Sequence, residues 1–93
     1  MPFRFSWDPA KAASNGRQHW VTFEEASTTF GDPLSITIPD PEHSVDEVRF
    51  VLVGLSDRQR LLVVVHATWG DVIRIISARL ATRRERTLYE EEP

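Results

Sequence analysis

Two apolar, β-branched runs separated by three polar residues constrain the fold more than any other feature. The first extends from Glu47 to Ser56 and the second from Arg60 to Trp69, with the sequence DRQ between them. Such runs are typical of strands, and a connection this short makes them antiparallel neighbours. The second run contains LLVVV, which is apolar without alternation and therefore predicts a central strand covered on both faces.

Local signals predict the other elements around this pair of strands. Alternation predicts a strand at Phe3–Trp7, and a capping box predicts a helix start at Thr22 and another at Thr82. The full set is a strand at 3–7, a helix at 8–19 with Asp8 as N-cap, a helix from Thr22 ending before Gly31, a short strand within 33–44, strands at 47–56, 60–69 and 72–79, and a helix at 81–92. The order β-α-α-β-β-β-β-α predicts an α+β domain. Its antiparallel sheet has about four to five strands, with two N-terminal helices and one C-terminal helix.

The composition narrows the class of protein. The 93 residues suit one domain, residues 1–93, with one modest core. The chain has no cysteine, three scattered histidines and no apolar run as long as the roughly 18 residues of a membrane helix. We therefore expect a cytoplasmic domain without metal or other cofactor and without a membrane segment.

Charge is segregated along the chain although the net charge is only -3. From Glu24 to Glu47 there are seven acidic residues and no lysine or arginine, whereas from Arg49 to Arg86 eight arginines face three acidic residues. Arginine suits planar, bidentate phosphate contacts. The pattern favours an anion-binding face, although salt bridges between the two halves would produce it too.

Two motifs carry a resemblance to a known family. WDPAKAASN near the N-terminus and IRIISAR, followed by ER and a tyrosine, occur here in order from Phe5 to Tyr89. The chain resembles the BrnT family of toxins from type II toxin–antitoxin pairs. The resemblance implies a RelE-like fold and a metal-independent endoribonuclease that inhibits translation by cutting messenger or ribosome-associated RNA. It also implies a BrnA-like ribbon-helix-helix antitoxin, which would supply any contact with DNA.

Metal-free cleavage of RNA by the neighbouring 2′-OH needs a base, an acid and positive charge around the phosphorus. We predict that arginines bind the RNA phosphates, with Arg74 and Arg79 also catalytic; the set is Arg49, Arg74, Arg79 and Arg83. Arg74 and Arg79 are an odd number of residues apart, so on a regular strand they point to opposite faces unless Arg79 lies past its end. The alternative is an arginine-rich surface that binds acidic antitoxin segments.

Lys11, Asn15 and His19 share one face of the first predicted helix, since each is one turn from the next. The resemblance places a basic residue, an Asn and a His there, which makes Lys11 and His19 catalytic candidates; His19 would be the acid or base. Alternatively, Asn15 and His19 finish the helix and pack under Trp20. We expect His66 to be a core or edge residue and His43 to be solvated.

Several positions depart from the family pattern. A basic residue followed by His-Gly is replaced by Gln18, His19 and Trp20, and Thr-Glu-Arg is replaced by Ala67, Thr68 and Trp69. Val72 and Leu80 occupy positions that are often arginine or lysine. The glutamate absent near position 68 is a plausible general base. Drift or engineering would explain the changes, and their apolar members could converge into an interface for a partner or a homo-oligomer: Trp20, Trp69, Val72 and Leu80. The alternative function is thus a non-enzymatic interaction module or a catalytically weakened, engineered variant.

Overall fold

The predicted pair of apolar strands forms the centre of a five-stranded sheet. In the computed structural model, which describes residues 3–44 and 47–91, β3 (Arg49–Leu55) pairs antiparallel with β4 (Leu61–Trp69). The strand order is β1-β5-β4-β3-β2, so β4 is central as its uninterrupted apolar run predicts. The remaining elements are β1 (Arg4–Ser6), α1 (Pro9–His19), α2 (Phe23–Thr28), η1 (Thr29–Gly31), β2 (Ile36–Pro39), η2 (Pro41–His43), β5 (Val72–Leu80) and α3 (Arg83–Glu91).

The predicted element order and the α+β class are confirmed, but the sheet is mixed. Strands β2 to β5 are antiparallel neighbours, whereas β1 pairs in parallel with β5. Short turns fix the direction of successive strands. Most of the chain lies between β1 and its partner β5, so no short turn sets the direction of β1. Among the described residues, no helix is long and apolar enough to cross a membrane.

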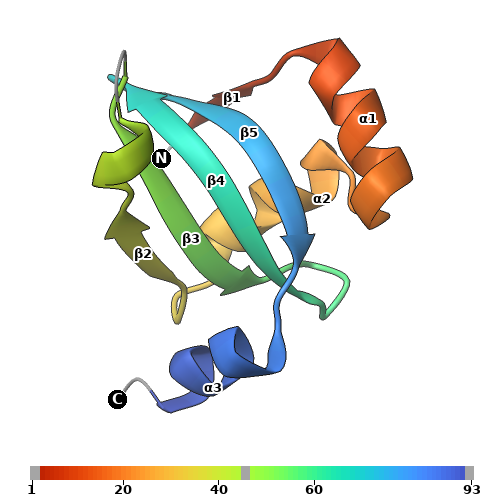
Figure 1. Ribbon diagram of the computed structural model, residues 1–93, viewed down its shortest axis with the longest axis vertical. Coiled ribbons are helices and arrows are strands. Elements are labelled where there is room, and N and C mark those ends of the chain that lie inside the picture. The colour runs from red at the N-terminus through yellow and green to blue at the C-terminus, as the bar shows by residue number, and fades with distance from the viewer. Residues whose placement is uncertain (1–2, 45–46, 92–93) are drawn as a thin grey trace.

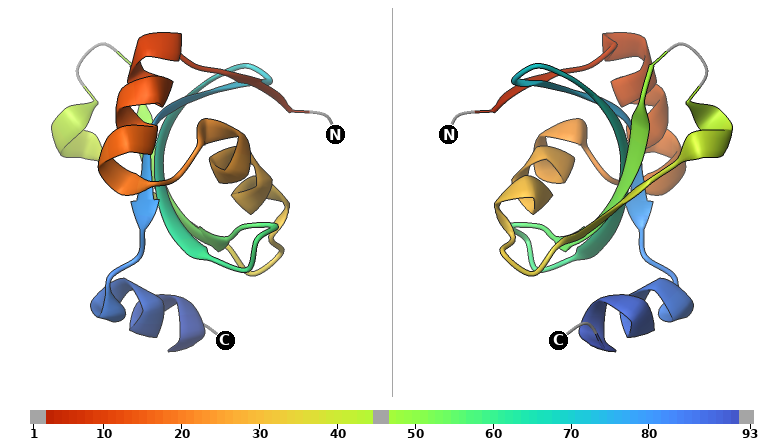
Figure 2. Two further views of the ribbon diagram at one scale, coloured as in Figure 1. Left: turned by 90° about the vertical axis from the view of Figure 1, so that its right-hand side faces the viewer. Right: turned by 90° about the vertical axis from the view of Figure 1, so that its left-hand side faces the viewer.

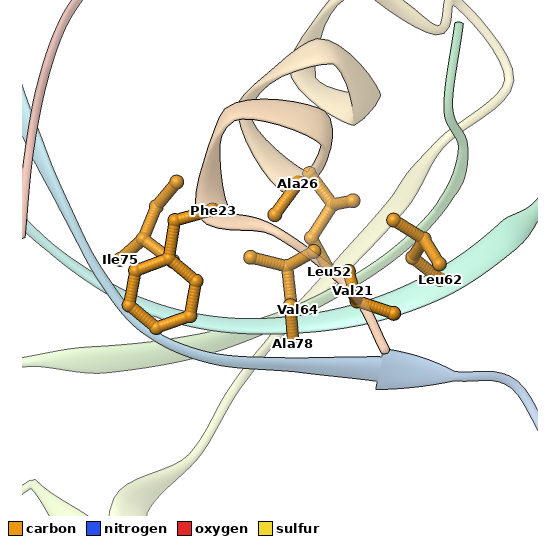
Figure 3. Packing of buried hydrophobic residues seen from close by; sticks show 8 residues of the cluster. All are labelled: Val21, Phe23, Ala26, Leu52, Leu62, Val64, Ile75 and Ala78. Atoms are coloured by element: carbon orange, nitrogen blue, oxygen red, sulfur yellow. The ribbon is translucent and has the colours of Figure 1, made fainter. Parts of the chain in front are cut away.

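Helix α2 lies on the concave face of the curved sheet, which we call the inner face (Figure 2). Its Phe23 and Ala26 are fully buried against residues of three strands. Figure 3 shows this core, which consists of Val21, Phe23, Ala26, Leu52, Leu62, Val64, Ile75 and Ala78.

Figure 1 looks onto the opposite face, which we call the outer face. A second cluster of Val53, Leu61 and Val63 lies there, with Ala81 and Tyr89 from the C-terminal segment packed against it. The start of β4 is therefore covered on both faces, because Leu62 and Val64 belong to the inner core. The middle of the sheet is flanked by α1, α3 and η2 (Figure 1).

A β-bulge interrupts β5. Val65 is opposite Ser77 and His66 is opposite Ile75, so Ile76 is an extra residue without a partner in β4. A bulge of this kind reverses the alternation of faces beyond it. Ile73 and Ile75 before the bulge and Ala78 after it are accordingly all buried.

Candidate functional site

The bulge places Arg74 and Arg79 on the same outer face of β5. Their cross-strand partners are Ala67 and Val63, and Val63 belongs to the outer cluster. The expectation of opposite faces assumed a regular strand and is wrong here. Arg79 does not lie past the strand, since β5 extends to Leu80.

A third arginine lies in the same row as Arg74. Ala67 is directly opposite both Arg49 on β3 and Arg74 on β5, so the small, fully buried alanine separates two guanidinium groups. Glu47 reaches over this row. Its Oε1 accepts a hydrogen bond from Arg74 Nη2 and lies 3.7 Å from Arg49 Nε. Two arginines therefore share one carboxylate, so the three side chains together keep a net positive charge.

Arg79 is held by the start of α3. Its Nη1 and Nη2 donate to the two oxygens of Glu85 at 2.8 and 2.7 Å, a bidentate pair. Arg79 lowers the pKa of Glu85 to about 2, opposed by burial and assisted by Thr82. The predicted capping box is confirmed, because Glu85 N–H donates to Thr82 Oγ1 and Thr82 N–H donates to Glu85 Oε1. Arg83 is exposed on the first turn of this helix.

Helix α1 lies beside the free edge of β5, and a shallow groove runs between them. The groove is lined by Lys11, Ser14, Asn15, Gln18, His19, Ile76 and Ser77. The structure thus brings Lys11 and His19 together as predicted, next to the bulge. Asn15 is buried instead of facing a ligand, and its amide bonds to Ala78 and Val21 at 2.8–3.1 Å. Neither residue packs under Trp20, whose side chain is 80% exposed.

The predicted apolar patch does not form as one surface. Trp69 and Val72 are directly paired and line a hollow with Ser6 and Arg74. Trp20 lies a strand's length away, where its carbonyl accepts a hydrogen bond from Arg60 just before β4 begins. Leu80 is at that far end too, opposite Leu62. At about 3.3 Å per residue, the length of β4 separates the two groups by roughly 25 Å along the strand.

Position 68 is on the wrong face for the base expected there. Thr68 pairs with Ile73, which is buried on the inner side, whereas Ala67 pairs with Arg74 on the outer side. A glutamate in place of Thr68 would follow the inner alternation of β4 and would not face Arg74. The expectation rested on the resemblance to the family pattern, which does not give the face.

His66 and His43 have the places predicted for them. His66 is 3% exposed on the inner face, with its ring 4.8 Å from Phe30 and 5.8 Å from Phe50, centroid to centroid. Burial lowers the pKa of His66, since the charged ring loses water. His43 is exposed and its Nδ1 lies 2.9 Å from Asp40 Oδ2.

An ion pair that the sequence did not predict joins α2 to the start of β4. Arg60 Nε donates to Glu25 Oε2 at 2.9 Å, and Ser56 Oγ donates to the same oxygen at 2.7 Å. The hydrogen bond from Arg60 lowers the pKa of Glu25, while burial opposes it. The capping box at Thr22 is therefore half-formed: Glu25 N–H bonds to Thr22 Oγ1, but the Glu25 side chain turns to Arg60. A capping-box pattern marks the helix start and cannot reveal a distant competitor.

The fold and this site define a class of protein. It is a small α+β domain in which the outer face of the sheet is rich in arginine and lies beside a groove between α1 and β5. Its fold is similar to the crystal structure of the Brucella abortus ribonuclease toxin BrnT, with a TM-score of 0.68 and 18% identity over 88% of this chain and 100% of that chain. Residues 7–85 match the family model of the ribonuclease toxin BrnT of type II toxin–antitoxin systems. The chain therefore belongs to the BrnT family of ribonuclease toxins. A comparison with curated proteins gave no match.

Proposed function

We propose that this chain is a metal-independent endoribonuclease that inhibits translation and is neutralised by a BrnA-like antitoxin. The observation that carries the proposal is the β5 bulge, since it puts Arg74 and Arg79 on one face and next to the groove of Lys11 and His19. Together they could contact one RNA backbone, with Arg49 in the same row and Arg83 nearby on α3.

The proposed roles follow from the chemistry of each group. Arg74 and Arg79 stabilise negative charge on the phosphate in the transition state, and Lys11 adds a further cation from the helix side. His19, exposed in the groove, donates or accepts a proton. The 2′-OH of the RNA is the nucleophile, so the reaction needs no metal-bound water.

A second candidate function is binding without catalysis. Glu47 and Glu85 already pair with the arginines, so a phosphate must compete with two carboxylates. Gln18, Val72 and Leu80 stand where the family pattern has cations, which weakens RNA binding further. In this alternative the outer face binds only a partner protein, for which the antitoxin is the candidate.

Incubating the purified protein with single-stranded RNA in excess EDTA distinguishes the two functions. Cleavage that persists in EDTA supports the ribonuclease, whereas intact RNA at micromolar protein supports the binding module. Arg74→Ala and Arg79→Ala should each weaken RNA binding and reduce its salt slope by about one phosphate contact. Arg58→Ala, in the exposed turn before β4, is the matched control and should leave the slope unchanged.

The antitoxin is proposed to be a ribbon-helix-helix dimer that holds two toxins and makes all contacts with DNA. An acidic antitoxin segment could take the places of Glu47 and Glu85 against the arginines. We expect the purified toxin alone to leave DNA unshifted in a gel and the co-purified pair to shift its operator. A shift by the toxin alone would contradict this division of labour.

A further inference from the structure

Glu47 lies at the centre of the arginine row. It precedes β3 by two residues, and its carboxylate contacts Arg49 from β3 and Arg74 from β5 above the buried Ala67. The Glu47 side chain is only 10% exposed, whereas those of Arg49 and Arg74 are 31% and 35% exposed. The guanidinium groups are thus more accessible to a phosphate arriving from solvent than the carboxylate is.

We propose that Glu47 is the general base of this ribonuclease, an assignment that rests on the proposed function. Glu47 takes the proton of the 2′-OH as its oxygen bonds to phosphorus, while Arg49 and Arg74 hold the phosphate oxygens. The bond from phosphorus to the 5′-oxygen breaks, and that oxygen takes a proton from water, to which Glu47 later returns the proton it took. The products are a 2′,3′-cyclic phosphate and a 5′-hydroxyl, so no oxidant or water is consumed.

The other described carboxylates near the row are engaged differently. Glu85 uses both oxygens on Arg79, and Oε1 also accepts from Thr82 N–H. Asp71 is exposed at the β4–β5 turn, where it pairs with Arg4 at 3.3 Å. Both contacts of Glu47 instead fall on Oε1. Glu47 therefore combines partial burial, two phosphate-binding neighbours and an oxygen outside both ion pairs.

Glu47 reaches the arginines that a glutamate at position 68 would not face. The family pattern has a glutamate there, and this chain has Thr68 on the inner face. The count of charges along the chain did not predict a role for Glu47, because Glu47 is the last residue of an acidic segment that is typical of a solvated surface. Only the pairing of β3, β4 and β5 brings it beside Arg74.

Single-turnover cleavage of a short RNA by the full chain tests the assignment. Glu47→Gln should reduce the cleavage rate by about 100-fold or more, while its RNA affinity stays equal or rises because a competing charge is gone. Glu47→Asp should retain part of the rate, and the alkaline limb of the pH–rate profile should be unchanged. Glu24→Gln, on the exposed side of α2, makes the same chemical change on the opposite face and should leave the rate unchanged.

The outcomes distinguish the assignment of Glu47 as general base from the proposed ribonuclease function on which it rests. Wild-type protein without cleavage overturns the proposed function and the base together. Active wild-type protein with a Glu47→Gln rate within about threefold overturns only the base. A Glu47→Gln variant that loses affinity, with its single-turnover rate at saturation kept, shows that Glu47 merely positions the arginines; circular dichroism must show the same fold in every variant.

Discussion

At the scale of single residues, the Asn15 side chain completes a strand edge that β1 leaves open. β1 pairs with β5 only from Val72 to Arg74. Further along, Asn15 Oδ1 accepts from Ala78 N–H at 3.1 Å, and Nδ2 donates to the Ala78 carbonyl at 2.8 Å. A side-chain amide thus makes the two hydrogen bonds that a neighbouring strand would make, and it fixes α1 against the sheet.

Replacing Asn15 should therefore destabilise the fold. In Asn15→Ala, buried backbone groups of Ala78 and Val21 lose their partners, and we expect the free energy of unfolding to fall by about 2–4 kcal/mol. Urea denaturation measures this change. Ser14→Ala, at the preceding residue of α1, is the control; a loss under about 1 kcal/mol for Asn15→Ala would show that water replaces the amide.

His66 predicts a pH dependence of stability. Burial lowers its pKa in the folded state, whereas the unfolded chain has a value near 6.5. The unfolded state therefore binds more protons below about pH 6.5, so the stabilisation is complete above that pH and declines as pH falls toward the lower folded value. Glu25 and Asp32 lose their contributions only at lower pH, since their pKa values are lowered from 4.5 and 3.8.

Urea denaturation at a series of pH values between about 7.5 and 5 measures this contribution. His66→Phe fills the same space between Phe30 and Phe50 with a ring that does not titrate, and it should flatten the curve in that range. An equally steep decline in wild type and variant would assign the effect to other groups.

At the scale of elements, the sequence predicts where helices and strands start better than what they contact. Thr82 and Glu85 form their capping box as predicted, because both partners are three residues apart. The bulge at Ile76 was not predictable, since no glycine or other local signal marks it. The same is true of Tyr89, whose hydroxyl donates to Asp32 at 2.6 Å and anchors α3; burial and Asp32 raise its pKa to about 12.

The C-terminus of α1 carries backbone strain. Trp20 caps the helix in the left-handed region, with φ 59° and ψ 33°, a conformation that favours glycine. Since its side chain is mostly exposed, little packing offsets the strain. Trp20→Gly should raise the free energy of unfolding by about 1 kcal/mol, measured by urea denaturation. Trp20→Ala, which removes the ring and keeps the strain, is the comparison; Gly being no more stable than Ala would contradict the strain.

At the scale of the whole molecule, the separation of the tryptophans argues against self-association. Trp69 and Val72 alone offer roughly 200–300 Å² of apolar area, whereas a stable dimer buries about 800 Å² per partner. Sedimentation at micromolar concentrations should give a monomer for wild type and for Trp69→Arg alike. A wild-type dimer that Trp69→Arg dissolves would restore the predicted interface. The sequence could not show that these residues lie apart, because their distance in space depends on the register of β4 and β5.

The parallel pairing of β1 with β5 has a consequence for synthesis on the ribosome. The chain emerges from the exit tunnel in order, so Arg4 cannot pair with Val72 until the helices and the strands between them have been made. Pairing over so long a loop is slow as well as late. Arg74 also leaves the tunnel after Arg49, so the arginine row is assembled only once β5 has emerged. A nascent chain that has not yet exposed β5 therefore has neither the complete sheet nor the arginine row.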